Sequence, residues 1–205
     1  MYVDYDKLLP DVVQILFSEG IEDESFNKNR AIYAIRNAYK EFVRDTHILR
    51  RDIVIPTQSC VQDYSLMKYD GHIITKIYSV EVEHQDHEIY VYKKADLCGF
   101  HDCYHTYEYD GRFMKIHPEP ECDGREIRIC VSMMPSSDIC LMDERIYELY
   151  GEYIAEGAAA TLLSAENGVR YRRYYTIGKD IAQADAAEQW SRRDIKDKRL
   201  KWRRR

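Results

Sequence analysis

Cysteine and histidine gather in one short stretch, Cys98-Gly-Phe-His101-Asp-Cys103-Tyr-His105. On an extended strand, His101, Cys103 and His105 would project to the same face. Thiolate and imidazole are ligands that Zn²⁺ prefers, so this face could bind zinc with Cys98 or a distant residue as a fourth ligand. The spacing matches no common structural zinc module, which pairs its ligands in two knuckles. We therefore interpret the stretch as a surface loop, and we expect no metal or cofactor.

A second group of titratable residues lies between two apolar segments, where a charged hairpin loop is expected. Carboxylates and imidazoles placed together can transfer protons or bind hard cations. The chain has no Gly-rich phosphate loop, no GxSxG, no HExxH and no EF-hand pattern. The sequence therefore does not indicate an enzyme. The residues of this group are Glu81, Glu83, His84, Asp86, His87 and Glu88.

The C-terminal residues form a third group, which is strongly basic. Nine Lys/Arg and two Asp give residues 192–205 a charge of +7, which leaves about −13 elsewhere because the total is −6. Arg and Trp suit nucleic acid, through phosphate contacts and base stacking. They equally suit an acidic groove on a protein. Because the rest of the chain is acidic, we favour a protein partner for this segment. A frayed, solvated C-terminus is the alternative interpretation. The residues are Arg192, Arg193, Lys196, Lys198, Arg199, Lys201, Trp202, Arg203, Arg204 and Arg205.

The composition indicates one folded domain, or one domain with an insertion. The chain has 205 residues, of which 45% are hydrophobic, so a substantial core can form. No apolar run approaches the length of a transmembrane helix, and the acidic N-terminus is unlike a signal peptide. None of the six cysteines forms a CxxC pair, so we expect free thiols in a reducing cytoplasm.

The periodicity of apolar residues predicts helices at both ends of the chain and strands between them. Helical spacing predicts a short helix within residues 1–20 and a second that is capped by Asp23 or Ser25 and runs to about Asp45. It also predicts a C-terminal helix over about 171–190, which could continue into the basic tail. Alternating apolar residues and turn signals such as Asp110-Gly111 predict an antiparallel region between them. The expected fold is α+β, a bundle of about four helices, two N-terminal and two C-terminal, with an inserted antiparallel β-sheet. The predicted segments are 1–48, 49–135, 136–190 and a basic arm at 191–205.

The third predicted helix, residues 143–167, has an unusual centre of small residues from Gly157 to Ala160. Its apolar residues recur every three or four positions, which is typical of a buried helix. Asp138 or Asp143 could cap its start, and Asn167-Gly168 could end it. Small side chains would let another backbone approach closely. The predicted packing residues are Tyr153, Gly157, Ala158 and Thr161.

The order of these elements resembles the head-to-tail adaptor proteins of short-tailed bacteriophages, also called connector or tail tubular proteins. The pattern spans nearly the whole chain. Met67 departs from it, because such proteins often have Pro at that place, and so does the Cys/His stretch. The residues that carry the resemblance are Ile55-Pro56-Thr57, Tyr64-Ser65-Leu66, Met114 to Pro120, Ile127 to Pro135, and Tyr153 to Ala160.

The resemblance implies a structural virion protein that performs no chemistry. Such a protein docks on the portal protein, forms a ring that extends the DNA channel, and presents a platform for other tail proteins. DNA would pass through without sequence-specific binding, and an acidic channel wall would help it to slide. The basic arm, Arg192 to Arg205, would tether the chain to the portal. The protein would be made in the host cytoplasm, with no membrane contact, and could be a monomer before assembly.

Two other function classes stay open at this point. One is a nucleic-acid-binding or DNA-packaging accessory protein that uses the basic arm. The other is a small metal-dependent enzyme centred on residues 98–105.

Overall fold

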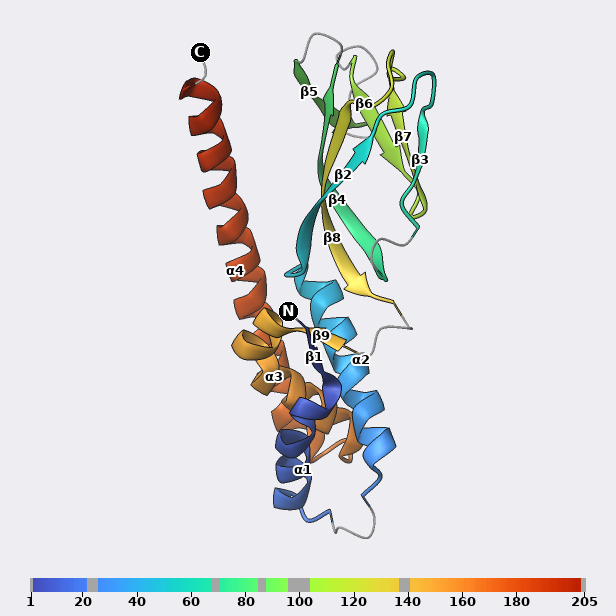
Figure 1. The fold of residues 1–205 in the computed structure, drawn as a ribbon. Helices are drawn as coiled ribbons and strands as arrows, with labels where there is room; N and C mark the ends of the chain where they lie inside the picture. The colour runs from blue at the N-terminus through green and yellow to red at the C-terminus, as the bar shows by residue number, and fades with distance from the viewer. Residues whose placement is uncertain are drawn as a thin grey trace. The chain divides into compact units, whose positions relative to one another are not determined.

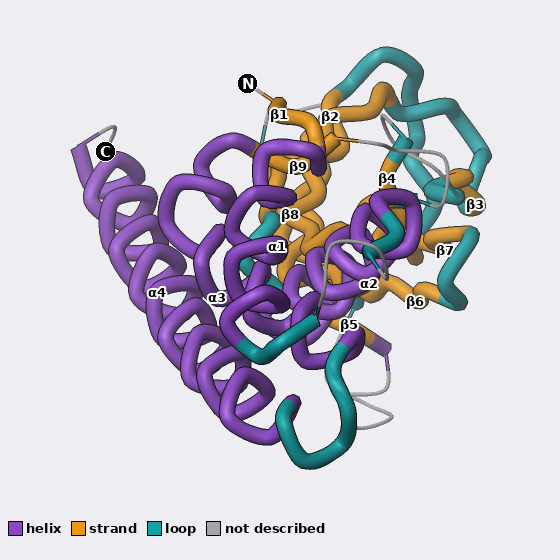
Figure 2. The backbone as a smooth tube through the Cα atoms, turned by 90° about the horizontal axis from the view of Figure 1, so that it is seen from below, coloured by secondary structure: helices purple, strands orange, loops and turns teal. Residues whose placement is uncertain are grey.

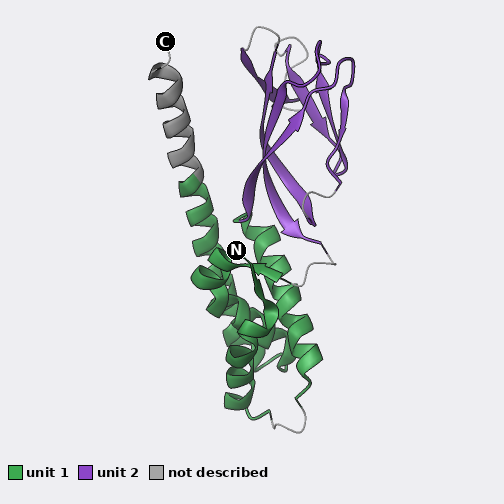
Figure 3. Ribbon diagram, viewed as in Figure 1, with its two compact units in different colours: residues 1–48, 140–205 green, residues 49–139 purple. Residues whose placement is uncertain are grey.

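The chain forms two compact units in a computed structural model (Figure 3). The structure describes residues 2–21, 26–67, 71–84, 88–95, 104–136 and 141–203, and side chains only as far as residue 189. Unit 1 comprises Met1–Ile48 and Cys140–Arg205, and unit 2 comprises Leu49–Ile139. The fold is α+β, with two N-terminal and two C-terminal helices packed together and an inserted, curled, seven-stranded mixed sheet. The predicted fold class is thereby confirmed.

Unit 1 is the helical unit, and α3 lies at its centre (Figures 1 and 2). α1, α2 and α4 all pack against α3, so its apolar surface is covered on several sides. A two-stranded antiparallel pair joins the N-terminus to the residues before α3. The elements are β1 (Tyr2–Asp4), η1 (Tyr5–Leu8), α1 (Leu9–Ser18), α2 (Lys28–Thr46), β9 (Leu141–Asp143), α3 (Glu144–Leu162) and α4 (Gly168–Arg203).

Local capping sets the helix ends in unit 1. The Asn27 side chain accepts a hydrogen bond from the Arg30 amide at 3.0 Å, which starts α2. α2 ends where His47 adopts a left-handed conformation, with φ of 52°. Asp143 caps α3 by accepting from the amides of Arg145 and Ile146. The sequence had offered Asp138 or Asp143 for this cap, and the structure selects Asp143.

Unit 2 is the sheet unit, with strand order β2-β8-β4-β5-β6-β7-β3. Its longest pairing joins β4 to β8, whose Ile127, Ile129 and Val131 are fully buried. Two backbone hydrogen bonds join the loop after β2 to the loop before β8. The Thr57 amide donates to the Arg125 carbonyl at 2.7 Å, and the Cys60 amide donates to the Pro120 carbonyl at 3.0 Å. The strands are β2 (Arg50–Pro56), β3 (Asp63–Ser65), β4 (His72–Glu83), β5 (Ile89–Lys94), β6 (Thr106–Tyr109), β7 (Phe113–His117) and β8 (Glu126–Pro135).

The sheet differs from the prediction in one pairing. β5 and β6 are parallel over Lys93↔Thr106 and Lys94↔Tyr107, whereas the other pairs described are antiparallel. A parallel pair needs a crossover connection, so hairpin signals do not indicate it. The predicted hairpin around Asp110-Gly111 is confirmed as β6 and β7. Its turn is stabilised by the Asp110 carboxylate, which accepts from the amides of Arg112 and Phe113, both at 2.7 Å.

The end of α3 and the start of α4 also differ from those predicted. α3 ends at Leu162 instead of Asn167-Gly168, because the chain turns extended at Leu163. Gly168 then begins α4, where an added Cβ would lie 2.8 Å from the Ala160 carbonyl oxygen. α4 extends to Arg203 and therefore includes most of the predicted basic arm. The short β1–β9 pair was not predicted, because three residues give too little periodicity.

Candidate functional site

α3 and α4 pack closely against each other in unit 1, and two glycines make this possible. A Cβ added at Gly157 of α3 would lie 2.5 Å from the Tyr175 ring of α4. A Cβ added at Gly178 of α4 would lie 2.4 Å from the Tyr153 ring of α3. Real Cβ atoms do not approach other heavy atoms this closely. Each glycine therefore accommodates an aromatic ring from the opposite helix.

Tyr175 also connects α4 to α2. Its hydroxyl donates to the Ala38 carbonyl at 2.6 Å, and its ring lies 6.0 Å from that of Phe42. Burial raises the pKa of Tyr175 far above its usual value, with smaller contributions from Glu41 and Asp45. The phenol therefore stays protonated and remains a donor to Ala38. One aromatic residue thus fixes the positions of three helices.

Polar contacts also join α4 to α3 and to α2. The Tyr150 hydroxyl of α3 donates to the Asp185 carboxylate of α4 at 2.5 Å. The Lys179 ammonium lies 2.6 Å from a Glu41 carboxylate oxygen and 2.8 Å from one of Asp45, both on α2. The Lys179 side chain is only 15% exposed, so these ion pairs are partly shielded from solvent. They hold α4 in register on the bundle.

The Lys179 contact gives unit 1 an acid-sensitive component of stability. Burial of Asp45 opposes its ionisation, but hydrogen bonds from Arg44 and Lys179 outweigh this and lower its pKa below 3.8. The contribution of Asp45 is therefore present above pH 3.8 and is lost as the pH falls through its lower folded-state pKa.

We expect Asp45→Asn to lower the unfolding free energy at pH 7 by about 1 kcal/mol or less, and by still less near pH 3. Urea titrations at both pH values, with exposed Asp180→Asn as the control, test this. An equal loss at both pH values would contradict it.

The predicted packing residues have different places in the structure. Gly157 and Ala158 are buried in the bundle, and Tyr153 is half-buried against Gly178. Thr161 is exposed, and its hydroxyl donates to the Ala158 carbonyl at 2.7 Å. The prediction that Thr161 packs in the interior is therefore wrong, because Thr161 lies in the last turn of α3, which ends at Leu162. Gly178 was missed, although a glycine within a long helical pattern is a recognisable signal of close packing.

The basic arm continues the same helix. α4 runs to Arg203, so Arg192, Lys196, Arg199 and Arg203 are spaced by four, three and four residues and share one helical face. The last buried residue of α4 whose side chain is described is Ala186. The side chains of the other predicted arm residues also lie outside the described set, as do residues 204 and 205 entirely.

Only His105 of the four candidate metal ligands lies in the described structure. It stacks on Tyr90 with ring centroids 4.6 Å apart, and its ring lies 5.1 Å from Tyr92 and 5.5 Å from His84. Burial lowers the pKa of His105, and the neighbouring His84 lowers it further. Cys98, His101 and Cys103 lie outside the described residues. Among the residues that are described, no group of three or more His, Cys, Asp or Glu could hold a metal ion.

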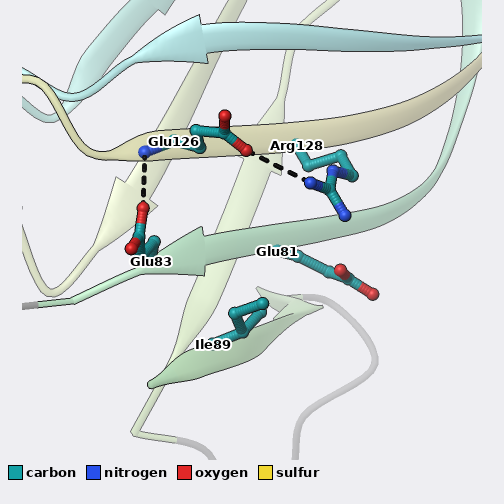
Figure 4. Close-up of a pocket in the computed structure, with 5 residues that line it drawn as sticks. All are labelled: Glu81, Glu83, Ile89, Glu126 and Arg128. Carbon is teal, nitrogen blue, oxygen red and sulfur yellow. Dashed lines mark hydrogen bonds and ion pairs between the residues drawn. The ribbon is translucent and has the colours of Figure 1, made fainter. Parts of the chain in front are cut away.

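The acidic group predicted to form a loop lies partly on strand β4. Glu81 and Glu83 line an open hollow of about 260 Å³ together with Ile89, Glu126 and Arg128 (Figure 4). Arg128 donates to the Glu126 carboxylate at 3.1 Å, and the Glu126 amide donates to Glu83 at 3.5 Å. The side chains of Glu126 and Arg128 are thus paired with each other on the sheet unit.

Two other members of the group are described. His84 contacts the aromatic cluster around His105, and the Glu88 carboxylate accepts from the Tyr90 hydroxyl at 3.0 Å. Asp86 and His87 lie outside the described residues.

A scan against protein-family models finds no match to this chain, and a search of curated proteins finds none either. Within the described residues, no helix has the length and apolar character needed to cross a membrane.

Proposed function

We propose that the chain is a structural head-to-tail adaptor of a short-tailed bacteriophage, which docks on the portal protein and forms a ring that extends the DNA channel. The observation that carries the proposal is the order of elements: two helices, an inserted sheet, then two helices that end in a basic segment. The resemblance to adaptor proteins rests on this order. The ring and the platform for tail proteins follow from that resemblance.

The charge distribution supports a role beside DNA without tight binding to it. Residues 1–191 carry a charge of about −13, by subtraction of +7 from the total of −6. Negative charge repels the phosphate backbone, so DNA can slide through a channel lined by such a surface. The basic segment then suits an acidic surface on the portal protein, where Arg side chains can pair with carboxylates.

A phage that lacks the gene for this chain tests the proposal. We expect DNA-filled heads without tails, visible by negative-stain electron microscopy, and recovery of tailed particles when the gene is supplied on a plasmid. In wild-type particles, antibody labelling should mark the junction between head and tail. Heads that fail to fill with DNA, or tailed and infectious particles without the gene, would contradict the adaptor function.

The helical arm supports one alternative, a nucleic-acid-binding or DNA-packaging accessory protein. Arg192, Lys196, Arg199 and Arg203 share one face of α4 and could follow a phosphate backbone. In that case DNA affinity would fall steeply with salt and would be lost when the arm is removed. Weak DNA binding by both full-length and shortened chains would favour the adaptor.

A further inference from the structure

α4 carries two apolar stripes, and unit 1 uses only one of them. The inner stripe faces the bundle and consists of buried Tyr171, Tyr175, Gly178, Ala182 and Ala186. The second stripe, which we call the outer seam, lies about one quarter-turn around the helix from the inner stripe. It consists of the exposed residues Arg170, Tyr174, Ile177, Ile181, Ala184 and Glu188.

The outer seam has the spacing of a coiled coil. Its members are separated by four, three, four, three and four residues, which is the repeat that brings one helix against another. Tyr174, Ile177 and Ile181 are 46%, 40% and 41% exposed, so their apolar surface is not covered by unit 1. Two isoleucines and a tyrosine in such a row are unusual on a solvent-facing helix. The spacing indicates that a second helix would pack against these residues.

Leu149 of α3 is a further exposed apolar residue of unit 1. Tyr153 of α3 touches Gly178 of α4, and the two helices are antiparallel. Leu149 is one turn before Tyr153, so it lies at the level of α4 one turn after Gly178. It is 54% exposed. Both helices of the hairpin therefore carry exposed apolar side chains.

We propose that the outer seam binds the outer seam of a second copy of this chain, with the two α4 helices antiparallel. In that register large residues face small ones, since Tyr174 lies opposite Ala184 of the other copy. Ile177 lies opposite Ile181, at the centre of the contact. At each end Arg170 lies opposite Glu188. Size and charge are thus complementary between two identical helices, which is the self-complementary arrangement that a two-fold dimer requires.

The end charges already have contacts within their own chain, and these leave capacity for a partner. Arg170 donates to the Tyr171 hydroxyl at 2.8 Å and lies 3.8 Å from Glu19. A guanidinium has five N–H donors, and a carboxylate such as Glu188 accepts several hydrogen bonds. The inference does not depend on the proposed function, because it concerns the free protein.

Sedimentation equilibrium of the purified full chain over a range of micromolar concentrations tests this proposal. We expect a reversible monomer–dimer equilibrium. Ile181→Glu should weaken dimerisation at least about tenfold, because it places a charge at the apolar centre. Val169→Glu is the matched control, since Val169 is 62% exposed on α4 but lies outside the seam. It should leave the dimer unchanged, and circular dichroism should show that both variants are folded.

A charge swap tests the antiparallel register. Arg170→Glu and Glu188→Arg should each weaken the dimer, and the double variant should restore it, because each new pair is again of opposite charge. A chain that stays monomeric at all concentrations would overturn the proposal, as would an assembly larger than a dimer. Dimerisation unaffected by Ile181→Glu, or a double variant no tighter than the single ones, would also overturn it.

Discussion

Ending the chain at Ser191 should lower its affinity for the portal protein at least about tenfold while leaving unit 1 folded. The truncation removes nine Lys/Arg and two Asp, which is a net loss of seven positive charges. The inner stripe of α4 ends at Ala186, so the bundle keeps all the packing contacts described above. Binding of full-length and shortened chains to immobilised portal protein, measured by surface plasmon resonance, gives the comparison.

A matched control separates the position of the charge from its amount. Arg172 and Arg173 are exposed residues of the same helix, outside the basic arm. Replacing both by Gln should change portal affinity much less than replacing Lys198 and Arg199 by Gln. Affinity of the full-length chain should also fall as salt rises, because charged surfaces are screened. Equal docking by full-length and shortened chains would show that the arm is not the tether.

Gly157→Leu should prevent unit 1 from folding. An alanine Cβ at this position would already lie 2.5 Å from the Tyr175 ring, and a leucine side chain adds three more carbons. Tyr175 cannot move aside freely, because its ring is 6% exposed and its hydroxyl is bonded to Ala38 of α2. We expect a loss of about 4 kcal/mol or more, which is a large part of the stability of an ordinary domain. Far-ultraviolet circular dichroism and thermal unfolding measure it.

Two further variants identify the cause of this loss. Thr161→Leu, one turn later at an exposed position near the end of α3, should change the unfolding free energy by less than about 1 kcal/mol. Gly157→Ala should be destabilising by roughly 1–3 kcal/mol from overpacking, reduced by about 1 kcal/mol of gained helix propensity. In a protein that also carries Tyr175→Leu, Gly157→Ala should lower the unfolding free energy by less than it does alone. A Gly157→Leu protein with normal melting would show that the close contact is wrong.

The overall architecture was predictable because long periodic segments dominate it. Helical spacing in α2 and α3 and alternation in β8 identified those elements, and Asp110-Gly111 identified a hairpin. The parallel β5–β6 pair was not predictable, because it depends on a crossover and not on a local turn. The β1–β9 pair is too short to leave a pattern.

The packing site was predictable only in part. The small centre of α3 indicated a close approach, and the structure places Tyr175 there. The sequence does not say which helix approaches, so Thr161 was assigned to the interior although it is exposed. The predicted C-terminal helix includes Tyr174, Ile177 and Ile181, but the sequence does not distinguish a second apolar stripe on it. The two apolar stripes of α4 lie about one quarter-turn apart on the helix. The spacing of apolar residues in the sequence therefore does not separate the two stripes.

The central claim is that this chain docks on a portal ring as an adaptor, and electron microscopy of the mixed proteins tests it most directly. Purified portal protein mixed with the full chain should give particles that carry an added ring, with the channel continuous through both. The same mixture with the chain ended at Ser191 should give bare portals. Portal particles that remain bare with the full chain would contradict the adaptor function.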